Sequence, residues 1–307
     1  MMPGVPTRIS VIIPTHERPE TCALAVRSAL RQTRPPHEVI VCCDGCTPEA
    51  VSSLREIAGP VRVLDLPKAR GYGYGNRNDA MEQAEGEVVA WLADDDLYLP
   101  DHLERIGEVH DAGDYEIVQG TACHVRVDGF VEAMGDDWSH PFISEQMREG
   151  GRAASTMSAI SHRIETAQRV GGWNADMDAG ADIDLWRRMA PVAAAVTLAA
   201  PTVLHLRGTG RGQSPAERIE QNRALFLRMD DPVELARLRA EMGHAMYRRF
   251  ADHQQEGHHL KLEVEELRRR LEAEAADAEK LRQLRERLMP LLRARWMLRQ
   301  RLSGRRG

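Results

Sequence analysis

Three consecutive aspartates, Asp94, Asp95 and Asp96, follow an apolar run at residues 88–92. The run has the composition of a buried strand of an α/β sheet, so the carboxylates are expected at its C-terminal end. Ligands of open α/β sheets bind beyond the carboxyl ends of the strands. Three neighbouring carboxylates repel one another there, and a divalent cation with oxygen ligands, Mn²⁺ or Mg²⁺, offsets the repulsion. The run therefore indicates a metal site.

A second interpretation of the aspartate run is a solvated loop that caps the following helix. Pro100 and residues 101–106 have the composition of a helix start. A cap needs one acidic residue, whereas three of them end an apolar strand here. We therefore favour the metal-binding interpretation.

Polar residues also follow two earlier strand candidates. The apolar segment at 8–14 leads into the sequence THER, and the segment at 38–43 leads into DGCT. The helix after the first of these segments can face a phosphate or a base with its N-terminus. Asp44, the first residue of DGCT, can accept hydrogen bonds from a base or a sugar, although Asp-Gly is also a good turn.

The chain has five cysteines, and Cys43 and Cys46 have the spacing of a redox pair or of half a zinc site. No second cysteine pair or nearby histidine pair completes a tetrahedral zinc site. A redox pair usually begins a helix, whereas this pair follows a strand and encloses Gly45. We therefore predict free, buried thiols.

Alternating strands and helices are expected to position these residues. Strand candidates at 8–14, 38–43, 61–66 and 88–92 alternate with helix candidates at 21–32, 49–58 and 78–84. This spacing predicts an α/β fold with a Rossmann-like, mostly parallel sheet and right-handed crossovers. The alternation weakens afterwards and predicts an α+β elaboration, with strands at 116–120, 122–127, 157–160, 192–198 and 202–206 and helices at 164–170 and 182–189.

Together these motifs resemble those of the family 2 inverting glycosyltransferases, which have the GT-A fold. The resemblance is carried by VIIPTHER at 11–18, SALRQT at 28–33, DGCT at 44–47, GNRN at 75–78 with AEGE at 84–87, and the aspartate run closing with Pro100. The motifs occur in the family's order and the resemblance extends over residues 8 to about 215. It implies a GT-A sheet flanked by helices.

The resemblance also implies transfer of a sugar from a nucleotide-diphosphate donor, with a divalent metal (Mn²⁺ or Mg²⁺) bridging the donor's phosphates. In the family, the loop after the first strand and the aspartate after the second hold the nucleoside. The corresponding residues here are Pro14, Thr15, Glu17, Arg18 and Asp44.

Two further residues are assigned to the donor by the same resemblance. Arg77 lies where a basic residue commonly approaches the nucleotide, and a guanidinium suits a pyrophosphate. An arginine at a helix start can instead pair with Asp79 or Glu82. His205 lies near the position where some members have a histidine or arginine beside the metal or diphosphate; the alternative is a strand histidine without that role.

Two assignments of the aspartate run stay open. Many family members have Asp-x-Asp-Asp, and counting back from Pro100 places Ala93 at the first of these positions. In that phase Asp95 is the metal ligand and Asp94 lies near the ribose. The literal Asp-x-Asp assignment chooses Asp94 and Asp96 instead.

An inverting transfer needs a general base that deprotonates the acceptor hydroxyl. Family members carry this carboxylate at a helix start after a Gly-aromatic-Asp/Glu stretch. The corresponding sequence here is GGWNAD at 171–176, followed by AGADIDLWRR at 179–188. Asp182 is therefore the candidate base and Asp184 its substitute; the alternative role for Asp182 is a helix N-cap.

The composition changes after residue 215. Residues 216–307 are rich in Arg, Glu, Leu and Ala, with partial heptads between 260 and 291 that indicate a coiled coil or a helical hairpin. We therefore expect a GT-A domain at 1–215 and a helical extension at 216–307 that forms homo-oligomers or docks onto a partner. The arginine-rich tail after residue 291 can contact an anionic membrane surface or an acidic partner, or be a solvated terminus.

The composition excludes few other classes. The formal net charge of −6 gives no reason to expect nucleic-acid binding, and no apolar run reaches the length of a membrane span. We expect a cytoplasmic protein, associated with the inner face of the membrane if the tail binds lipid.

The sequence thus predicts a metal-dependent inverting glycosyltransferase with Asp182 as general base. One alternative is a sugar nucleotidyltransferase, although the Gly-rich, Lys/Arg-bearing start of that class is not found here. The other is a non-catalytic coiled-coil scaffold with a degenerate glycosyltransferase domain. Nucleotide-sugar hydrolysis separates the enzyme from the scaffold.

Overall fold

The structure is a computed structural model, and it describes residues 5–126, 129–149, 151, 153–206 and 214–249. One compact unit comprises Met1–Gly208 and Gly212–Met246. Thr209–Arg211 and Tyr247–Gly307 form a second unit, most of which lies outside the described residues. The predicted coiled coil and the basic tail fall in that part, so both stay predictions.

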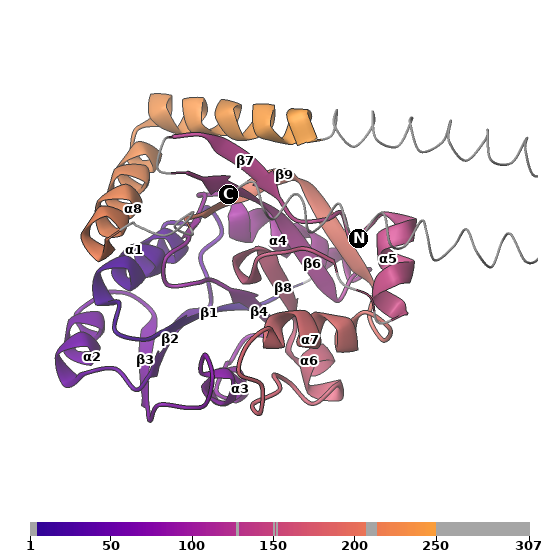
Figure 1. The fold of residues 1–307 in the computed structure, drawn as a ribbon, viewed down its shortest axis with the longest axis horizontal. Helices are drawn as coiled ribbons and strands as arrows, with labels where there is room; N and C mark the ends of the chain where they lie inside the picture. Colours follow the sequence, from indigo (N-terminus) through magenta and orange to yellow (C-terminus); the bar gives the residue numbers. More distant parts are fainter. Residues whose placement is uncertain (1–4, 127–128, 150, 152, 207–213, 250–307) are drawn as a thin grey trace, which may run out of the picture. The chain divides into compact units, whose positions relative to one another are not determined.

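The N-terminal half of the first unit has the predicted parallel sheet (Figure 1). Strands β1 (Ile9–Thr15), β2 (Glu38–Asp44), β3 (Val61–Leu66) and β4 (Val88–Trp91) lie in the order β3-β2-β1-β4 and pair in parallel. Helices α1 (Pro19–Leu30), α2 (Pro48–Arg55) and α3 (Tyr74–Glu82) connect them. The expected Rossmann-like arrangement is confirmed.

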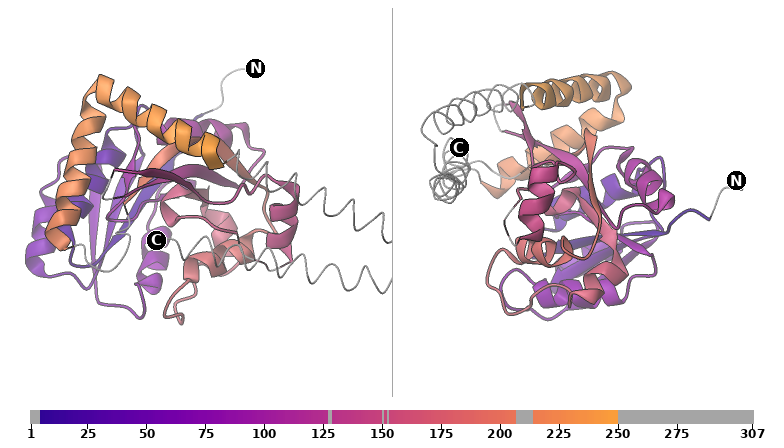
Figure 2. Two further views of the ribbon diagram at one scale, coloured as in Figure 1. Left: turned by 45° about the horizontal axis from the view of Figure 1, so that its top comes forward. Right: turned by 90° about the vertical axis from the view of Figure 1, so that its right-hand side faces the viewer.

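The central strands are mostly apolar and are buried along almost their whole length, because both faces of the sheet are covered (Figure 2). In β1, Val11 and Ile13 pack into one core with α1, whereas Ile12 packs into a second core that contains Trp91 and Trp173. This alternation fixes the register of the strand, since a one-residue slip would exchange the two sets.

The second half of the sheet is mixed, as expected, but its strands differ from the predicted ones. The segments predicted at 116–120 and 122–127 form one strand, β6 (Ile117–Val125), and those at 192–198 and 202–206 form β9 (Ala195–His205). The two strands pair in parallel with register shifts around Thr121, where β9 accommodates extra residues. Residues 157–160 begin with a 3₁₀ turn, η1 (Met157–Ala159), before β8 (Ile160–Arg163).

Several further elements complete this half. Strand β8 pairs antiparallel with β4 and β6, while β5 (Leu97–Tyr98) pairs with β9 and β7 (Val131–Met134) pairs with β6. Its helices are α4 (His102–Ala112), α5 (Pro141–Arg148), α6 (Ile164–Arg169) and α7 (Ala181–Met189). Sequence analysis did not predict β5 and α5.

Helix α8 (Pro215–Asp230) begins at a capping box, in which Ser214 and Glu217 bond each other's main chain, and lies beside α1 (Figure 1). A following helical segment starts at residue 232. Leu225 and Phe226 of α8, with Leu238 and Met242 of that segment, share an apolar core with Leu97, Leu99 and Leu204. The domain boundary predicted after residue 215 stays a prediction.

The five cysteines are free, and Cys22, Cys42, Cys43 and Cys123 are buried while Cys46 is half-buried. Among the described helices, none combines the length and the apolar character that crossing a bilayer requires. The expected cytoplasmic location and membrane contact stay predictions.

Candidate functional site

The carboxyl ends of β1 and β4 bring four predicted site residues into direct contact. The Thr15 hydroxyl donates to Asp94 Oδ2 at 2.7 Å. The Arg18 guanidinium donates from one nitrogen, Nη1, to Asp94 Oδ1 and Asp95 Oδ2, both at 3.2 Å. Pro14 precedes Thr15 in β1, opposite Cys42 of β2. The loop after the first strand and the aspartate run are therefore one cluster, as expected for parallel strands.

Asp96 is the fully enclosed member of the aspartate run. It is 0% exposed, and it accepts hydrogen bonds from the Ser158 hydroxyl and from the main-chain N–H of Leu206, the latter at 3.0 Å. His205 Nδ1 lies 3.0 Å from the same carboxylate. Burial alone would raise the pKa of Asp96, but His205 and these hydrogen bonds outweigh it and hold the pKa below its ordinary value. Asp96 therefore ties β4 to η1 and β9.

The surroundings of Asp94 and Asp95 stabilise the ionised carboxylate less than those of Asp96 do. Burial, with a smaller contribution from Asp95, raises the pKa of Asp94 to about 6. Burial and then Asp96 also raise the pKa of Asp95. The Asp95 side chain is 18% exposed, and its contacts in the described part of the chain involve Oδ2, to Arg18 at 3.2 Å and Arg218 at 3.9 Å. Asp95 Oδ1 is therefore available to a further ligand.

These contacts bear on the metal that the resemblance implies. Among the described residues, no group of three His, Cys, Asp or Glu side chains is arranged to hold a metal ion. Mg²⁺, however, is commonly bound by one or two carboxylates together with substrate phosphates rather than by an all-protein cage. Asp95, with an available carboxylate oxygen, is suited to such a site, whereas both oxygens of Asp96 accept hydrogen bonds from the protein.

Asp44 organises the loop between β3 and α3. Its Oδ1 accepts hydrogen bonds from Asn76 Nδ2 and from the main-chain N–H of Ala69, both at 2.7 Å, and its Oδ2 pairs with Lys68. Gly73 is required beside it, since its φ is +75° and an added Cβ would lie 2.7 Å from the carboxyl carbon. Asp44 is thus bound from two positions of this loop and from one position of α3, and sequence analysis had not assigned Lys68 or Asn76 to the site.

Glu17 lies at the same edge of the sheet. It adopts a positive φ of 55°, uncommon for a residue other than glycine, and its carboxylate accepts hydrogen bonds from the main-chain N–H and hydroxyl of Thr47. His16 Nδ1 lies 2.8 Å from the main-chain oxygen of Asp44. These contacts join the end of β1 to the end of β2, where the nucleoside was predicted to bind.

Arg77 on α3 is a cation enclosed by aromatic rings. Its guanidinium carbon lies 4.9 Å from the centre of the Tyr74 ring and 4.7 Å from that of Trp173. Its Nε atom is buried and has no hydrogen-bond partner among the described residues, and burial lowers its pKa. The alternative pairing with Asp79 or Glu82 does not occur in the described structure. Nη1 contacts Met157, which precedes the Ser158 that bonds Asp96.

Asp182 lies in the first turn of α7 and is half-buried. It makes no hydrogen bond or ion pair within the described part of the protein, although it is close enough to perturb the pKa of both Arg77 and Tyr74. The helix N-cap is Gly180 rather than Asp182. Asp184, by contrast, is bound by Arg188 Nη2 at 2.7 Å and Nε at 2.9 Å. Of the two candidate bases, Asp182 is the carboxylate left available.

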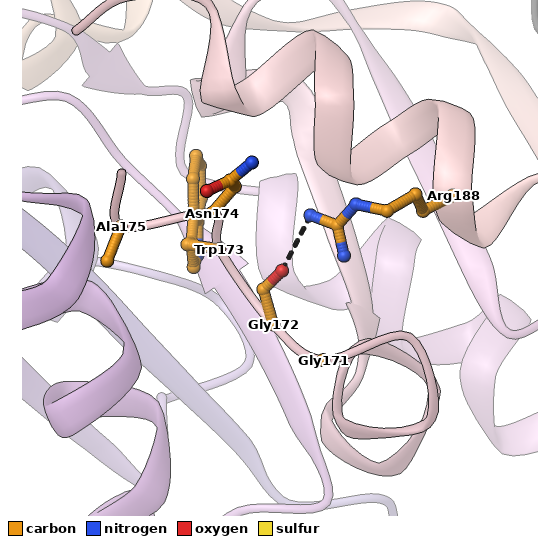
Figure 3. A pocket seen from close by; sticks show the side chains of 6 residues that line it. All are labelled: Gly171, Gly172, Trp173, Asn174, Ala175 and Arg188. Carbon is orange, nitrogen blue, oxygen red and sulfur yellow. Dashed lines mark hydrogen bonds between the residues drawn. The ribbon is translucent and has the colours of Figure 1, made fainter. Parts of the chain in front are cut away.

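An open hollow lies beside the loop that leads into α7 (Figure 3). It is lined by Gly171, Gly172, Trp173, Asn174, Ala175 and Arg188. Arg188 reaches across it and donates to the Gly172 carbonyl oxygen at 2.7 Å. None of the predicted site residues lines this hollow. Arg188 fixes the loop through its hydrogen bond to Gly172.

Comparisons with known proteins place these motifs in context. The family model described as Glycosyl transferase family 2 matches residues 10–161. The uncharacterized glycosyltransferase YwdF of Bacillus subtilis is 31% identical over 111 residues, which cover 35% of this chain and 40% of YwdF. The UDP-Glc:alpha-D-GlcNAc-diphosphoundecaprenol beta-1,3-glucosyltransferase WfgD of Escherichia coli is 29% identical over 97 residues, 31% of this chain and 38% of WfgD.

The matched segment thus spans about two fifths of the length of these curated relatives. Among solved structures, S. aureus TarS 1-349 in complex with UDP-GlcNAc superposes with a TM-score of 0.54 at 16% identity, covering 80% of this chain and 73% of that one. At that identity the likeness concerns the fold, and it confirms the expected GT-A architecture.

Proposed function

We propose that this chain, which belongs to glycosyl transferase family 2, transfers a sugar from a nucleotide-diphosphate donor to an acceptor hydroxyl with inversion. The observation that carries the proposal is an enclosed guanidinium that lies near an available carboxylate. Arg77 is an enclosed guanidinium without a carboxylate partner in the described structure, and Asp182 lies close enough to influence its pKa. A bound diphosphate would supply hydrogen-bond acceptors to Arg77, and an acceptor hydroxyl would donate to Asp182.

In the proposed reaction, Asp182 accepts the proton of the acceptor hydroxyl as the hydroxyl oxygen attacks the anomeric carbon. The new glycosidic bond forms on the face opposite the donor diphosphate. The bond between the anomeric carbon and the diphosphate oxygen breaks, and its electron pair leaves with the nucleoside diphosphate. In this proposal Arg77 binds the charge that develops on the diphosphate, since a guanidinium binds phosphate oxygens in pairs.

The nucleoside is proposed to lie over the ends of β1 and β2. Thr15 and Arg18 fix the aspartate run, while Glu17 and Asp44 fix the two loops that would border the base and ribose. A divalent cation would be held by Asp95 together with donor phosphates and would supply neutralising charge to the leaving diphosphate. His205 was predicted to lie beside the metal or diphosphate. In that role it would keep the contact of its Nδ1 with Asp96.

A thermal-shift screen of nucleoside diphosphates, with and without Mn²⁺, tests the proposal. A ligand that binds the folded state stabilises it by about 2.7 kcal/mol at a concentration one hundred times its dissociation constant. One nucleoside diphosphate is expected to raise the melting temperature more than the corresponding monophosphate. A response to nucleoside triphosphates alone would favour the nucleotidyltransferase, and no response to any nucleotide would favour the scaffold.

A further inference from the structure

Helix α8 faces the aspartate run with two side chains that lie one turn apart, Arg218 and Asn222. The Asn222 amide donates to the main-chain oxygen of Asp95 at 3.0 Å and is 0% exposed. Arg218 Nη1 lies 3.9 Å from Asp95 Oδ2. Residues four apart lie on one face of a helix, so a single face of α8 is directed at Asp95.

The position of α8 is fixed independently of these two contacts. Its capping box at Ser214 and Glu217 defines where the helix begins. Phe226 packs in the apolar core and against the Arg31 guanidinium, which also pairs with Asp230 at the end of the helix. Arg218 is therefore held at the rim of the aspartate run by the fold rather than by its weak contact with Asp95.

Arg218 makes little use of its hydrogen-bonding capacity. A distance of 3.9 Å is too long for a hydrogen bond, and Arg18 lies closer to the same carboxylate oxygen, at 3.2 Å. The Nε atom of Arg218 is buried without a hydrogen-bond partner among the described residues, whereas its side chain as a whole is 28% exposed. A buried, unsatisfied donor is costly, and oxygen atoms of a ligand would remove that cost.

We infer that Arg218 contacts the diphosphate of the donor. This inference rests on the proposed function, and it adds a residue from a helix that lies outside the segment matched by the family model, residues 10–161. Arg218 would bind phosphate oxygens through its planar fork, while Asn222 holds the helix face in register with Asp95. The donor site of this chain is then completed from its C-terminal side.

Calorimetric titration of the Arg218→Gln variant tests the inference. The titrants are the nucleoside diphosphate that gives the largest thermal shift and its parent nucleoside, each with and without Mn²⁺. Loss of a charged hydrogen bond is expected to weaken diphosphate binding about tenfold to a hundredfold and to leave nucleoside binding unchanged. Arg218→Lys should recover part of the affinity, because it keeps the charge but not the fork.

Arg223→Gln is the matched control, since Arg223 lies on the same helix, is exposed and pairs with Glu220 at 2.7 Å. It should bind both titrants as the wild type does. Equal affinity of Arg218→Gln and wild type for the diphosphate, or an equal loss for diphosphate and nucleoside, would overturn the inference while leaving the proposed function intact. A wild-type protein that binds no nucleoside diphosphate would overturn both.

Discussion

Asn78 of α3 and Trp173 pair through two reciprocal hydrogen bonds. The Asn78 amide nitrogen donates to the Trp173 main-chain oxygen at 2.9 Å, and its Oδ1 accepts from the Trp173 main-chain N–H at 2.8 Å. Arg188 donates a hydrogen bond to the main-chain oxygen of the preceding Gly172. Through these contacts the Trp173 ring is fixed against the Arg77 guanidinium, although the two residues are distant in the sequence.

Replacing Asn78 with alanine should therefore destabilise the protein. Both main-chain groups of Trp173 lose their partner, so the free energy of unfolding is expected to fall by about 1–3 kcal/mol. Urea unfolding measures this change. Asn174→Ala is the control, because exposed Asn174 makes a local turn with Asp176 and should change stability by less than about 0.5 kcal/mol. Equal effects of the two substitutions would contradict the proposed role of the pair.

The aspartate run should separate into structural and functional members. Asp96→Asn removes a buried carboxylate that accepts hydrogen bonds from three residues, and should cost on the order of 3–5 kcal/mol of stability. Asp95→Asn should leave the urea midpoint near that of the wild type, because Asp95 Oδ1 has no partner in the described part, and burial together with the charge of Asp96 disfavours the ionised form. We expect Asp95→Asn to lose turnover nevertheless. A comparable loss of stability in both variants would refute this division.

Glu38 should give the protein a stability that depends on pH. It is 5% exposed and accepts hydrogen bonds from Glu85 N at 2.6 Å, Ser10 Oγ at 2.8 Å and Arg62 Nη1 at 2.8 Å. Burial opposes ionisation, but these bonds and the charge of Arg62 prevail and lower the pKa of Glu38 in the folded state. Its contribution is then fully present above the unfolded-state pKa of about 4.3 and is lost as the pH falls through the lower folded-state pKa.

The stability difference between wild type and Glu38→Gln should accordingly be about 1–3 kcal/mol at pH 7 and shrink below pH 4. Urea unfolding across that range measures it. Exposed Glu56, at the end of α2, supplies the control Glu56→Gln, which should show no such trend. A difference that stays constant down to pH 3 would show that packing rather than charge accounts for the effect.

Cys46 should be the first thiol to react with an alkylating reagent. A hydrogen bond from Cys43 lowers the pKa of Cys46. Partial burial opposes this shift, but a hydrogen bond with the Glu17 main chain also lowers the pKa. Burial instead raises the pKa of Cys42 to about 12. Mass spectrometry after brief iodoacetamide treatment of the native protein should find Cys46 labelled, with a rate that rises at a pH below the ordinary thiol value of about 8.5. Earlier labelling of another cysteine would contradict the assignment, and Cys46→Ser should abolish the fast phase.

The parallel half of the fold could be predicted because apolar runs and the spacing between them are local features of the sequence. Continuous apolar runs such as 38–43 identify buried strands, and their spacing identifies the crossovers. The strand at 195–205 was predicted as two pieces. Its pairing with β6 shifts register around Pro201, and such a shift interrupts the periodic pattern by which a strand is identified in the sequence. Strand β5 has two residues, which is too short for any periodicity.

The sequence predicted the site residues that follow the end of a strand. It did not predict the site residues that other elements contribute. Thr15, Arg18, Asp94 and Asp95 meet because parallel strands end at one edge. Ser158 and Arg218 reach the same run from η1 and α8, and neither has a sequence signal that distinguishes it from other polar residues.

The central claim is that Asp182 removes a proton at a site where a nucleotide sugar is bound. The most direct test is release of nucleoside diphosphate from the nucleotide sugar whose diphosphate stabilises the protein, measured in Mn²⁺ for wild type and Asp182→Asn. The account predicts turnover by the wild type, a loss of about a hundredfold to ten-thousandfold in the variant, and unchanged diphosphate affinity in both. Turnover by Asp182→Asn at the wild-type rate would contradict it.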